Sequence, residues 1–359
     1  GRAMSVLGWI PVTELGKTLC HEHLLINAEA LHVQVESKYK EESEKDLSDM
    51  ENLHWLRYFP YSHKKNLHVE EDSILEKELM WYKQAGGQTI VDVTISGLRP
   101  ELNNSEFSYA ESLAELSRKT GVHIVCGTGF YIDLVHPEFV ASATIDELAD
   151  FMVKELTVGI QNSSGICAGV IGEIGCSWPI TQGETKVLQA AATAQKRSGA
   201  PLIIHPGRNE EAPMEIVEIL RSAGADISRT VMSHLDRTIF TDSKWDQLAE
   251  TGIFLELDLF GTECSYYQQN SQVYMPHDGQ RIDRVSYLVK KGYTSQILLS
   301  HDIHTNHRLR SFGGHGFSHI FERIVPRLMS FGVSASDIET IIVHNPSRWL
   351  AFHEDCVQL

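Results

Sequence analysis

The sequence predicts an α/β fold, namely a TIM (β/α)8 barrel with long loops at the carboxyl ends of its strands. Two observations lead to this prediction: the 359 residues contain eight apolar, β-branched runs, and helical patterns lie between several of them. Runs that are apolar throughout are typical of parallel strands buried on both faces. A doubly wound sheet is the weaker alternative. Because no repeat or linker divides the chain, we expect one domain over residues 1–359.

The predicted strands are short segments rich in Val, Ile and Leu. They occupy residues 18–23, 89–95, 123–130, 168–174, 201–205, 229–234, 253–260 and 296–301. Helical patterns lie at residues 71–85, 145–158, 184–197 and 213–222. In the first of these, Leu75, Leu79 and Tyr82 recur at helical spacing, and the pair Gly86-Gly87 marks the end of the helix. The succession of strands and helices indicates βα units.

Two long segments between the predicted elements differ from ordinary loops. Residues 27–65 form a polar insertion after the first strand, with an acidic cluster followed by aromatic residues such as Trp55 and Tyr61. This insertion is either a solvated surface loop or a cover over an active site. After the seventh strand, residues 262–281 carry Tyr266 and Tyr267, and we expect this segment to act as a lid.

The composition argues against several classes of partner. The formal net charge is −17 and no dense run of Lys or Arg is present, so neither a nucleic acid nor an anionic membrane is an expected partner. No stretch approaches the roughly 18–20 consecutive apolar residues of a membrane span, and the expected location is the cytoplasm. The six cysteines show no CxxC pair, which favours buried reduced thiols. Residues 1–3 precede Met4 and are typical of a cloning remnant, so the fold prediction leaves them out.

Metal-ligand side chains end five of the eight predicted strands. Active sites of TIM barrels are built at the carboxyl ends of the strands, so these residues would meet at one face. A single histidine there is usually a polar cap, but six residues of metal-ligand type together favour a metal site. They are His21 and His23 on strand 1, Glu173 on strand 4, His205 on strand 5, His234 on strand 6 and Asp302 on strand 8. Glu22, between the first two, is expected to be structural and to face the barrel wall.

Four histidines and two carboxylates are more than one tetrahedral ion can use, so they predict two divalent metal ions. His21, His23 and Asp302 would hold one ion, His205 and His234 the other, and Glu173 would bridge them. Two ions about 3.5–4 Å apart can share a water whose pKa falls toward about 7, which provides a hydroxide nucleophile. Asp302 can take the proton of this hydroxide and pass it to the leaving group. No GxSxG, P-loop or GxGxxG motif offers a competing chemistry.

The strand-end motifs resemble those of the amidohydrolase superfamily, and within it the phosphotriesterase-related proteins of animals. The resemblance runs from about Val6 to Phe352. It is carried by segments such as His21-Glu22-His23-Leu24, Gly172-Glu173-Ile174-Gly175, His205-Pro206-Gly207-Arg208, Ser233-His234-Leu235-Asp236 and His301-Asp302-Ile303-His304. It implies a hydrolase with two divalent ions, zinc being the first expectation although manganese, iron and cobalt share these ligands. The resemblance also implies a homodimer, and the sequence by itself leaves the oligomeric state open.

Two positions depart from the bacterial phosphotriesterases. Those enzymes bridge their metals with a carboxylated lysine, whereas this chain has Glu173, which supplies the same pair of oxygens. Asp258 stands where they carry a histidine of a proton relay, and this puts efficient phosphotriester turnover in doubt. The resemblance instead implies hydrolysis of small N-acyl amino or sulfonic acids, above all of N-acetyltaurine to taurine and acetate.

A small anionic substrate requires a cation or oriented donors beyond the metals. Arg208 and Arg237 each lie three residues after a ligand histidine, and either could form a forked clamp on the anion, although an ordinary ion pair, for Arg237 with Asp236, is the alternative. Tyr131, after the third strand, could bond a substrate oxygen or cap the core. A lactonase or promiscuous phosphotriesterase is the second functional hypothesis, and a non-catalytic binding protein on the same barrel is the third.

Overall fold

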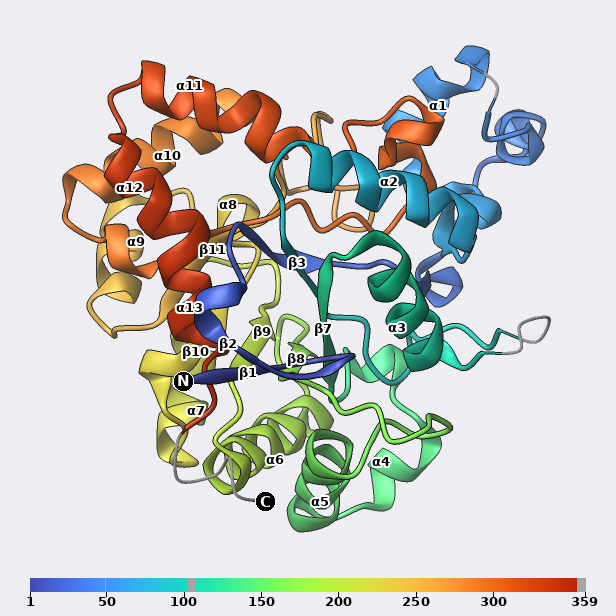
Figure 1. Cartoon of the computed structure of the whole chain (residues 1–359). Helices are drawn as coiled ribbons and strands as arrows, with labels where there is room; N and C mark the ends of the chain where they lie inside the picture. The colour runs from blue at the N-terminus through green and yellow to red at the C-terminus, as the bar shows by residue number, and fades with distance from the viewer. Residues whose placement is uncertain (49, 103–106, 354–359) are drawn as a thin grey trace.

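The computed structural model describes residues 1–48, 50–102 and 107–353, and a sheet of eight parallel strands lies at its centre. Each of the eight predicted strands is present. They are β3 (Thr18–Glu22), β6 (Thr89–Asp92), β7 (His123–Thr128), β8 (Val170–Gly175), β9 (Leu202–His205), β10 (Thr230–Met232), β11 (Phe254–Leu257) and β12 (Ile297–Leu299). The fold-class prediction is therefore confirmed, and the helices surround the strands as in a TIM barrel (Figure 1).

The strands neighbour one another in chain order, from β3 and β6 at one end to β11 and β12 at the other. Contacts between β12 and β3 complete the ring. The amide of His21 donates to Ser300 Oγ at 3.0 Å, and the amide of Asp302 donates to the carbonyl of His21 at 3.1 Å. Closure therefore brings the first and last predicted ligand segments side by side.

The helices begin and end where local signals predict. In α6, Thr181 caps the first turn in a capping box with Glu184, and Gly199 ends the helix with φ of 65°, a conformation that favours glycine. The four predicted helices correspond to α2 (Asp72–Gln84), α5 (Ile145–Thr157), α6 (Gln182–Ser198) and α7 (Ala212–Ser222). The others are α1 (Leu53–Tyr58), α3 (Tyr109–Thr120), α4 (Glu138–Ser142), α8 (Leu235–Thr238), α9 (Asp242–Ala249), α10 (Asp278–Lys290), α11 (Val325–Ser330), α12 (Ala335–Glu339) and α13 (Asn345–Leu350).

The amino-terminal residues, which the fold prediction left out, form part of a strand. Arg2–Ser5 form β1, which pairs antiparallel with β2 (Gly8–Pro11). Ala3 is buried in the same apolar cluster as Val91 of the barrel and Trp349 of α13. The backbone of residue 2 also accepts a hydrogen bond from the amide of Phe352. This hairpin excludes water from an apolar cluster inside the barrel, which is why residues 1–3 pack rather than extend into solvent.

The insertion at 27–65 is ordered by packing rather than by long elements. It contains α1 and several short 3-10 turns, and β4 (Ile26–Asn27) pairs with β5 (His68–Val69) across it. Among the described residues, no helix is long and apolar enough to cross a membrane. Cys20, Cys126 and Cys176 are buried free thiols, as expected, but Cys167 and Cys264 are only half-buried because they lie in surface loops. Cys356 lies outside the described residues.

Candidate metal centre

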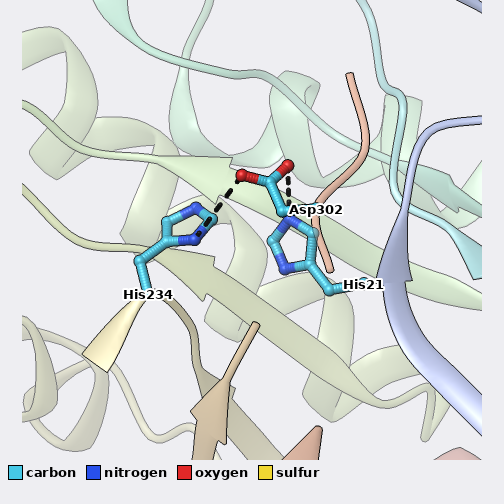
Figure 2. A group of neighbouring side chains, drawn as sticks. All are labelled: His21, His234 and Asp302. Atoms are coloured by element: carbon cyan, nitrogen blue, oxygen red, sulfur yellow. Dashed lines mark ion pairs between the residues drawn. The ribbon is translucent and has the colours of Figure 1, made fainter. Parts of the chain in front are cut away.

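The six predicted ligands meet at the carboxyl ends of the barrel strands. His21 lies on β3 and His23 directly follows it, Glu173 lies on β8, His205 ends β9, and His234 and Asp302 follow β10 and β12. All six are buried, and they form overlapping groups of potential ligand atoms that lie within 4.8 Å of one another. Figure 2 shows the carboxylate of Asp302 between the imidazoles of His21 and His234. The barrel therefore assembles one site from residues up to 281 positions apart.

The two oxygens of Glu173 face different pairs of histidines. Its Oε1 lies 3.5 Å from His21 Nε2 and 3.2 Å from His23 Nε2. Its Oε2 lies 2.9 Å from His205 Nδ1 and 3.3 Å from His234 Nε2. A carboxylate that presents one oxygen to each of two nitrogen pairs is arranged as a bridge between two neighbouring positions.

The donor atoms fit a divalent metal ion. His21 Nε2 is buried and has no hydrogen-bond partner among the described residues, so its lone pair is available to an ion. Asp302 Oδ1 lies 3.3 Å from His23 Nε2 and 3.8 Å from His21 Nε2. Ligand atoms around a tetrahedral ion with bonds of about 2.0–2.1 Å are themselves about 3.3 Å apart. A set of imidazole nitrogens and carboxylate oxygens suits zinc and the other first-row divalent ions.

Three of the ligand histidines are oriented by side chains that contact their Nδ1 atoms. His23 Nδ1 bonds Thr94 Oγ1 at 2.8 Å, and His21 Nδ1 lies 3.2 Å from Glu256 Oε2. His234 Nδ1 bonds Asp258 Oδ1 at 2.8 Å, and Asp258 Oδ2 accepts from the amide of His234. These contacts leave the Nε2 atoms facing the centre, as is usual for metal-binding histidines.

Burial and neighbouring charges shift the carboxyl groups at the site in opposite directions. Burial raises the pKa of Glu256 to about 7, although His21 partly opposes this, and Asp258 adds to the rise. For Glu173, burial also raises the pKa, but the imidazoles of His21, His205 and His23 outweigh it and hold the pKa well below its usual range. Glu173 is therefore ionised and available as a bridging ligand, whereas Glu256, behind His21, has one imidazole to oppose burial and the neighbouring carboxylate of Asp258 to add to it.

Two ligands have strained backbones that surrounding groups support. His234 and Asp302 have φ of 53° and 54°, in the left-handed region that costs a residue with a side chain about 1–3 kcal/mol. Glu22 supports the segment at Asp302: its carboxylate accepts from the amides of His301 and Ile303 at 2.9 and 3.0 Å. It is fully buried and faces this segment, which confirms the structural role expected for it.

The insertion reaches the metal ligands through Tyr61, which contacts His304 beside Asp302. His304 Nδ1 lies 3.1 Å from Asp302 Oδ1, and Tyr61 donates to His304 Nε2 at 2.7 Å. Gln268, from the loop after β11, accepts from the amide of Tyr61 at 2.9 Å and donates to Ser62 Oγ at 2.6 Å. The insertion and the loop after β11 therefore meet over the metal ligands. Of the two interpretations of residues 27–65, the structure favours a cover over the site.

The three residues expected to contact substrate have different surroundings. Arg237 is buried, faces the Tyr267 ring with its Cζ 4.9 Å from the ring centroid, and borders the ligand cluster. Its alternative ion pair with Asp236 is not formed, because Asp236 pairs with Arg281 at 2.7 Å. Arg208 also faces the Tyr267 ring, its Nη2 donates to the Tyr267 hydroxyl at 2.6 Å, and it does not line either space above the ligands.

Tyr131 lies next to the ligand His205. Its hydroxyl is 3.1 Å from His205 Nδ1, and the side chain also borders the small space above Glu173. Burial, and then the charge of Glu173, raises the pKa of Tyr131, so the phenol stays neutral and can donate a hydrogen bond. This position is compatible with contact to a substrate oxygen, which stays a prediction.

Two connected spaces lie above the ligands. The inner one, of about 20 Å³, is bounded by the ligands, by Tyr131 and by apolar side chains that include Leu31 and Leu98. The outer one, of about 410 Å³, is bounded by the insertion and by the loops after β11 and β12. Tyr61, Arg237, Tyr267, Asp302 and His304 border both spaces. A substrate could therefore place its reacting bond inside and extend outward past Arg237.

Several side chains at the site were not predicted to lie there. Glu256 was not singled out, and Asp258 was placed only as the substitute for a relay histidine, not as the partner of His234. Both lie in the seventh strand segment, and an acidic pair two residues apart in an apolar run was the available signal. Arg308, which borders the outer space and donates to the carbonyl of His301, gives no such signal. Nothing local indicates that Tyr61 reaches the site, because its position depends on the packing of the insertion.

Comparisons with known proteins agree with this geometry. The model of the Phosphotriesterase family matches residues 2–350. The chain is 45% identical to a zebrafish (Danio rerio) protein named N-acetyltaurine hydrolase and 46% identical to a phosphotriesterase-related protein of Nematostella vectensis. Each match covers 98% of this chain; it also covers 98% of the zebrafish protein and 99% of the Nematostella protein.

A solved structure shares the whole architecture. The crystal structure of a resiniferatoxin-binding protein from Rhodobacter sphaeroides superposes with a TM-score of 0.91 at 32% identity, covering 98% of this chain and 97% of that one. The family match, the full-length relatives and the buried cluster of ligand side chains all point the same way. The chain therefore belongs to the phosphotriesterase family and is a metal-dependent enzyme of the amidohydrolase type.

Proposed function

We propose that the protein holds two divalent metal ions, with zinc as the first candidate, and hydrolyses the amide of small N-acyl amino or sulfonic acids, above all N-acetyltaurine. The observation that carries the proposal is the orientation of Glu173, whose two oxygens face separate histidine pairs beside an inner space that Arg237 also borders. The name of the zebrafish relative supports N-acetyltaurine as the substrate. The reaction adds water to the acyl carbonyl, breaks the C–N bond and releases acetate and the amine.

The ligands divide into two sets in this proposal. His21, His23 and Asp302 would hold one ion, His205 and His234 would hold the other, and the two oxygens of Glu173 would be available to both. Bound divalent ions supply activation of water as a nucleophile at neutral pH and polarisation of the scissile carbonyl.

The side chains of the protein perform the remaining tasks. Asp302 Oδ2 takes the proton of the attacking water and returns it to the amine nitrogen that leaves. His304, in contact with Asp302 Oδ1, holds that carboxylate in place. Tyr131 donates a hydrogen bond to the acyl oxygen, and the inner space with its apolar wall receives the acetyl methyl group. Tyr61 and Tyr267 exclude bulk water from above.

Arg237 binds the sulfonate or carboxylate of the substrate. Its guanidinium is buried, its Nε has no hydrogen-bond partner among the described residues, and it borders both spaces. A buried cation without a carboxylate partner is costly, and an anionic substrate group supplies the missing counter-charge. Arg208 acts through Tyr267. Its guanidinium faces the Tyr267 ring and also donates a hydrogen bond to the Tyr267 hydroxyl.

The proposal is tested by metal analysis combined with substrate comparison. We expect about two ions per chain after purification, loss of activity on chelation, and recovery with added zinc. We expect kcat/KM for N-acetyltaurine to exceed that for lactones and paraoxon-type esters by at least about tenfold. Fewer than about one ion per chain without rescue by metal would refute the metal centre. Preference for a lactone or a phosphotriester would refute the substrate class while leaving the metal centre in place.

A further inference from the structure

A second cavity lies between α8, α9, α10 and the loop after β11. Its volume is about 380 Å³, within the roughly 300–1,000 Å³ typical of small-molecule pockets. The three helices lie on one side of the barrel (Figure 1), and ion pairs join α10 to both α8 and α9. None of the six metal ligands borders this cavity, and of the described residues only Met275 borders both it and the outer space. The cavity is therefore distinct from the proposed active site.

Most of the cavity wall is apolar or aromatic. It is formed by Ile239, Phe240, Trp245, Tyr274, Met275 and Pro276. Trp245 is fully buried and its ring is covered by the guanidinium of Arg284, with 5.2 Å between Cζ and the ring centroid. Phe240 and Tyr274, in contrast, are 51% and 76% exposed. An aromatic ligand between these two side chains would remove exposed apolar surface from water.

Two polar side chains that border the cavity have an unused donor and an unused acceptor. Asp236 and Arg281 are only 5% and 1% exposed, and Asp236 Oδ2 accepts from Arg281 Nε at 2.7 Å. Asp236 Oδ1 and Arg281 Nη2 are buried and have no hydrogen-bond partner among the described residues. Buried polar atoms are normally hydrogen-bonded, and leaving them unpaired costs free energy. A ligand group that offers a donor beside an acceptor would satisfy both atoms.

The charges around the cavity favour a neutral ligand. Arg281 pairs with Asp278 at 2.9 Å as well as with Asp236, and Arg284 pairs with Asp242 at 2.7 Å. Each cation at the cavity therefore has a carboxylate partner already, so an added anion or cation would lose its hydration without gaining a free counter-charge. A primary carboxamide is neutral and carries an N–H donor beside a carbonyl acceptor.

We infer that this cavity is a second binding site, which takes a neutral aromatic carboxamide. The ring of the ligand lies between Phe240 and Tyr274, its carbonyl oxygen accepts from Arg281 Nη2, and its N–H donates to Asp236 Oδ1. No bond of the ligand is broken there. The site is independent of the proposed amide hydrolysis, because it shares no metal ligand and does not include Arg237.

A matched series of small ligands tests this recognition. Benzamide is the probe, benzoate replaces its amide by an anion without N–H groups, and acetophenone keeps the carbonyl but lacks the N–H donor. In titrations followed by ligand-observed NMR, we expect benzamide to bind at least about tenfold more tightly than either, since hydrogen bonds to charged groups have effects of this size. Equal affinity of the three compounds, or no binding of benzamide up to about 10 mM, would overturn the inference.

Two variants locate the bound ring. Phe240→Ala and Tyr274→Ala should each weaken benzamide binding about threefold to tenfold, because each removes an aromatic wall of the cavity. Both side chains are exposed, so these variants should fold normally. Phe331→Ala is the matched control, since Phe331 is 50% exposed and does not border the cavity, and it should keep the wild-type affinity. Unchanged affinity in both wall variants would show that benzamide binds elsewhere, for example at the metal centre, and would overturn the inference.

A crystal structure of the benzamide complex provides the direct check on the polar contacts. We expect the amide nitrogen within hydrogen-bond distance of Asp236 Oδ1 and the carbonyl oxygen within the same distance of Arg281 Nη2. Ordered water on both atoms, with benzamide bound at another place or not at all, would overturn the inference. Loss of N-acetyltaurine hydrolysis in the wild-type protein would refute the proposed function and would leave this site unaffected.

Discussion

Replacement of Arg237 by methionine separates anion recognition from bond cleavage. The guanidinium is buried, borders both spaces above the ligands, and faces Tyr267 rather than a carboxylate. Methionine preserves much of the apolar stem while it removes the charge and all donors. If Arg237 binds the sulfonate, the variant loses a hydrogen bond to a charged group, which contributes about 1.5–3 kcal/mol. At about 1.4 kcal/mol per factor of ten, kcat/KM for N-acetyltaurine should fall roughly 10- to 150-fold.

The assay compares N-acetyltaurine with its neutral methyl-sulfone analogue, which keeps the amide and the linker but lacks the charge. Wild-type protein should prefer the anion, and Arg237→Met should lose that preference while its activity toward the neutral amide stays within about threefold. Arg208→Met is the matched control, because Arg208 contacts Tyr267 and does not border either space. We expect a smaller loss for that variant.

Thermal unfolding provides a second check on the same residue. Arg237 forms no ion pair with a carboxylate of the described residues, so its replacement should leave the melting temperature unchanged or raise it, since desolvation of the charge is no longer required. A large loss of stability in Arg237→Met would show that the guanidinium has a structural role. Equal losses for the anionic and neutral substrates, or no loss for either, would refute the anion clamp.

Three further predictions address the support around the site. Asp258→Asn should weaken metal affinity or activity about 10- to 100-fold, measured by metal titration, because Asp258 orients His234; normal affinity would contradict this role. Glu155→Gln should destabilise the protein by about 3 kcal/mol at pH 7 in denaturant unfolding, since Arg99 would stay buried without its partner. Burial raises the pKa of Glu155, but Arg99 outweighs burial, and the folded pKa lies below the ordinary value of 4.5. The stabilisation by the Arg99–Glu155 pair is therefore present above about pH 4.5 and is lost as the pH falls through the lower folded pKa. A difference in the free energy of unfolding between wild type and Glu155→Gln that grows as the pH falls would refute this role of the Arg99–Glu155 pair. Gln268→Ala should speed hydrogen exchange in the insertion and in the loop after β11, and unchanged exchange would show that Gln268 does not join them.

The barrel and its ligands follow from local sequence signals. Apolar runs predict strands buried on both faces, and in a TIM barrel the carboxyl ends of such strands converge. His205 and Asp302 could therefore be assigned to one site although they are far apart in the chain. The helix ends were similarly predictable, as at Gly199, because capping depends on neighbouring residues. The cytoplasmic location and the homodimer stay predictions.

The tertiary structure decided the features that depend on packing between distant segments. No local pattern indicates that Tyr61 of the insertion would bond His304, 243 positions away. The surroundings of Arg208 and Arg237 likewise depend on where Tyr267 lies, since both guanidinium groups face its ring. The sequence by itself determined which ligand atoms converge, because strand periodicity and barrel closure set their positions. Only the tertiary structure decided how the loops shape the space above them, because loop positions depend on side-chain contacts between segments far apart in the chain.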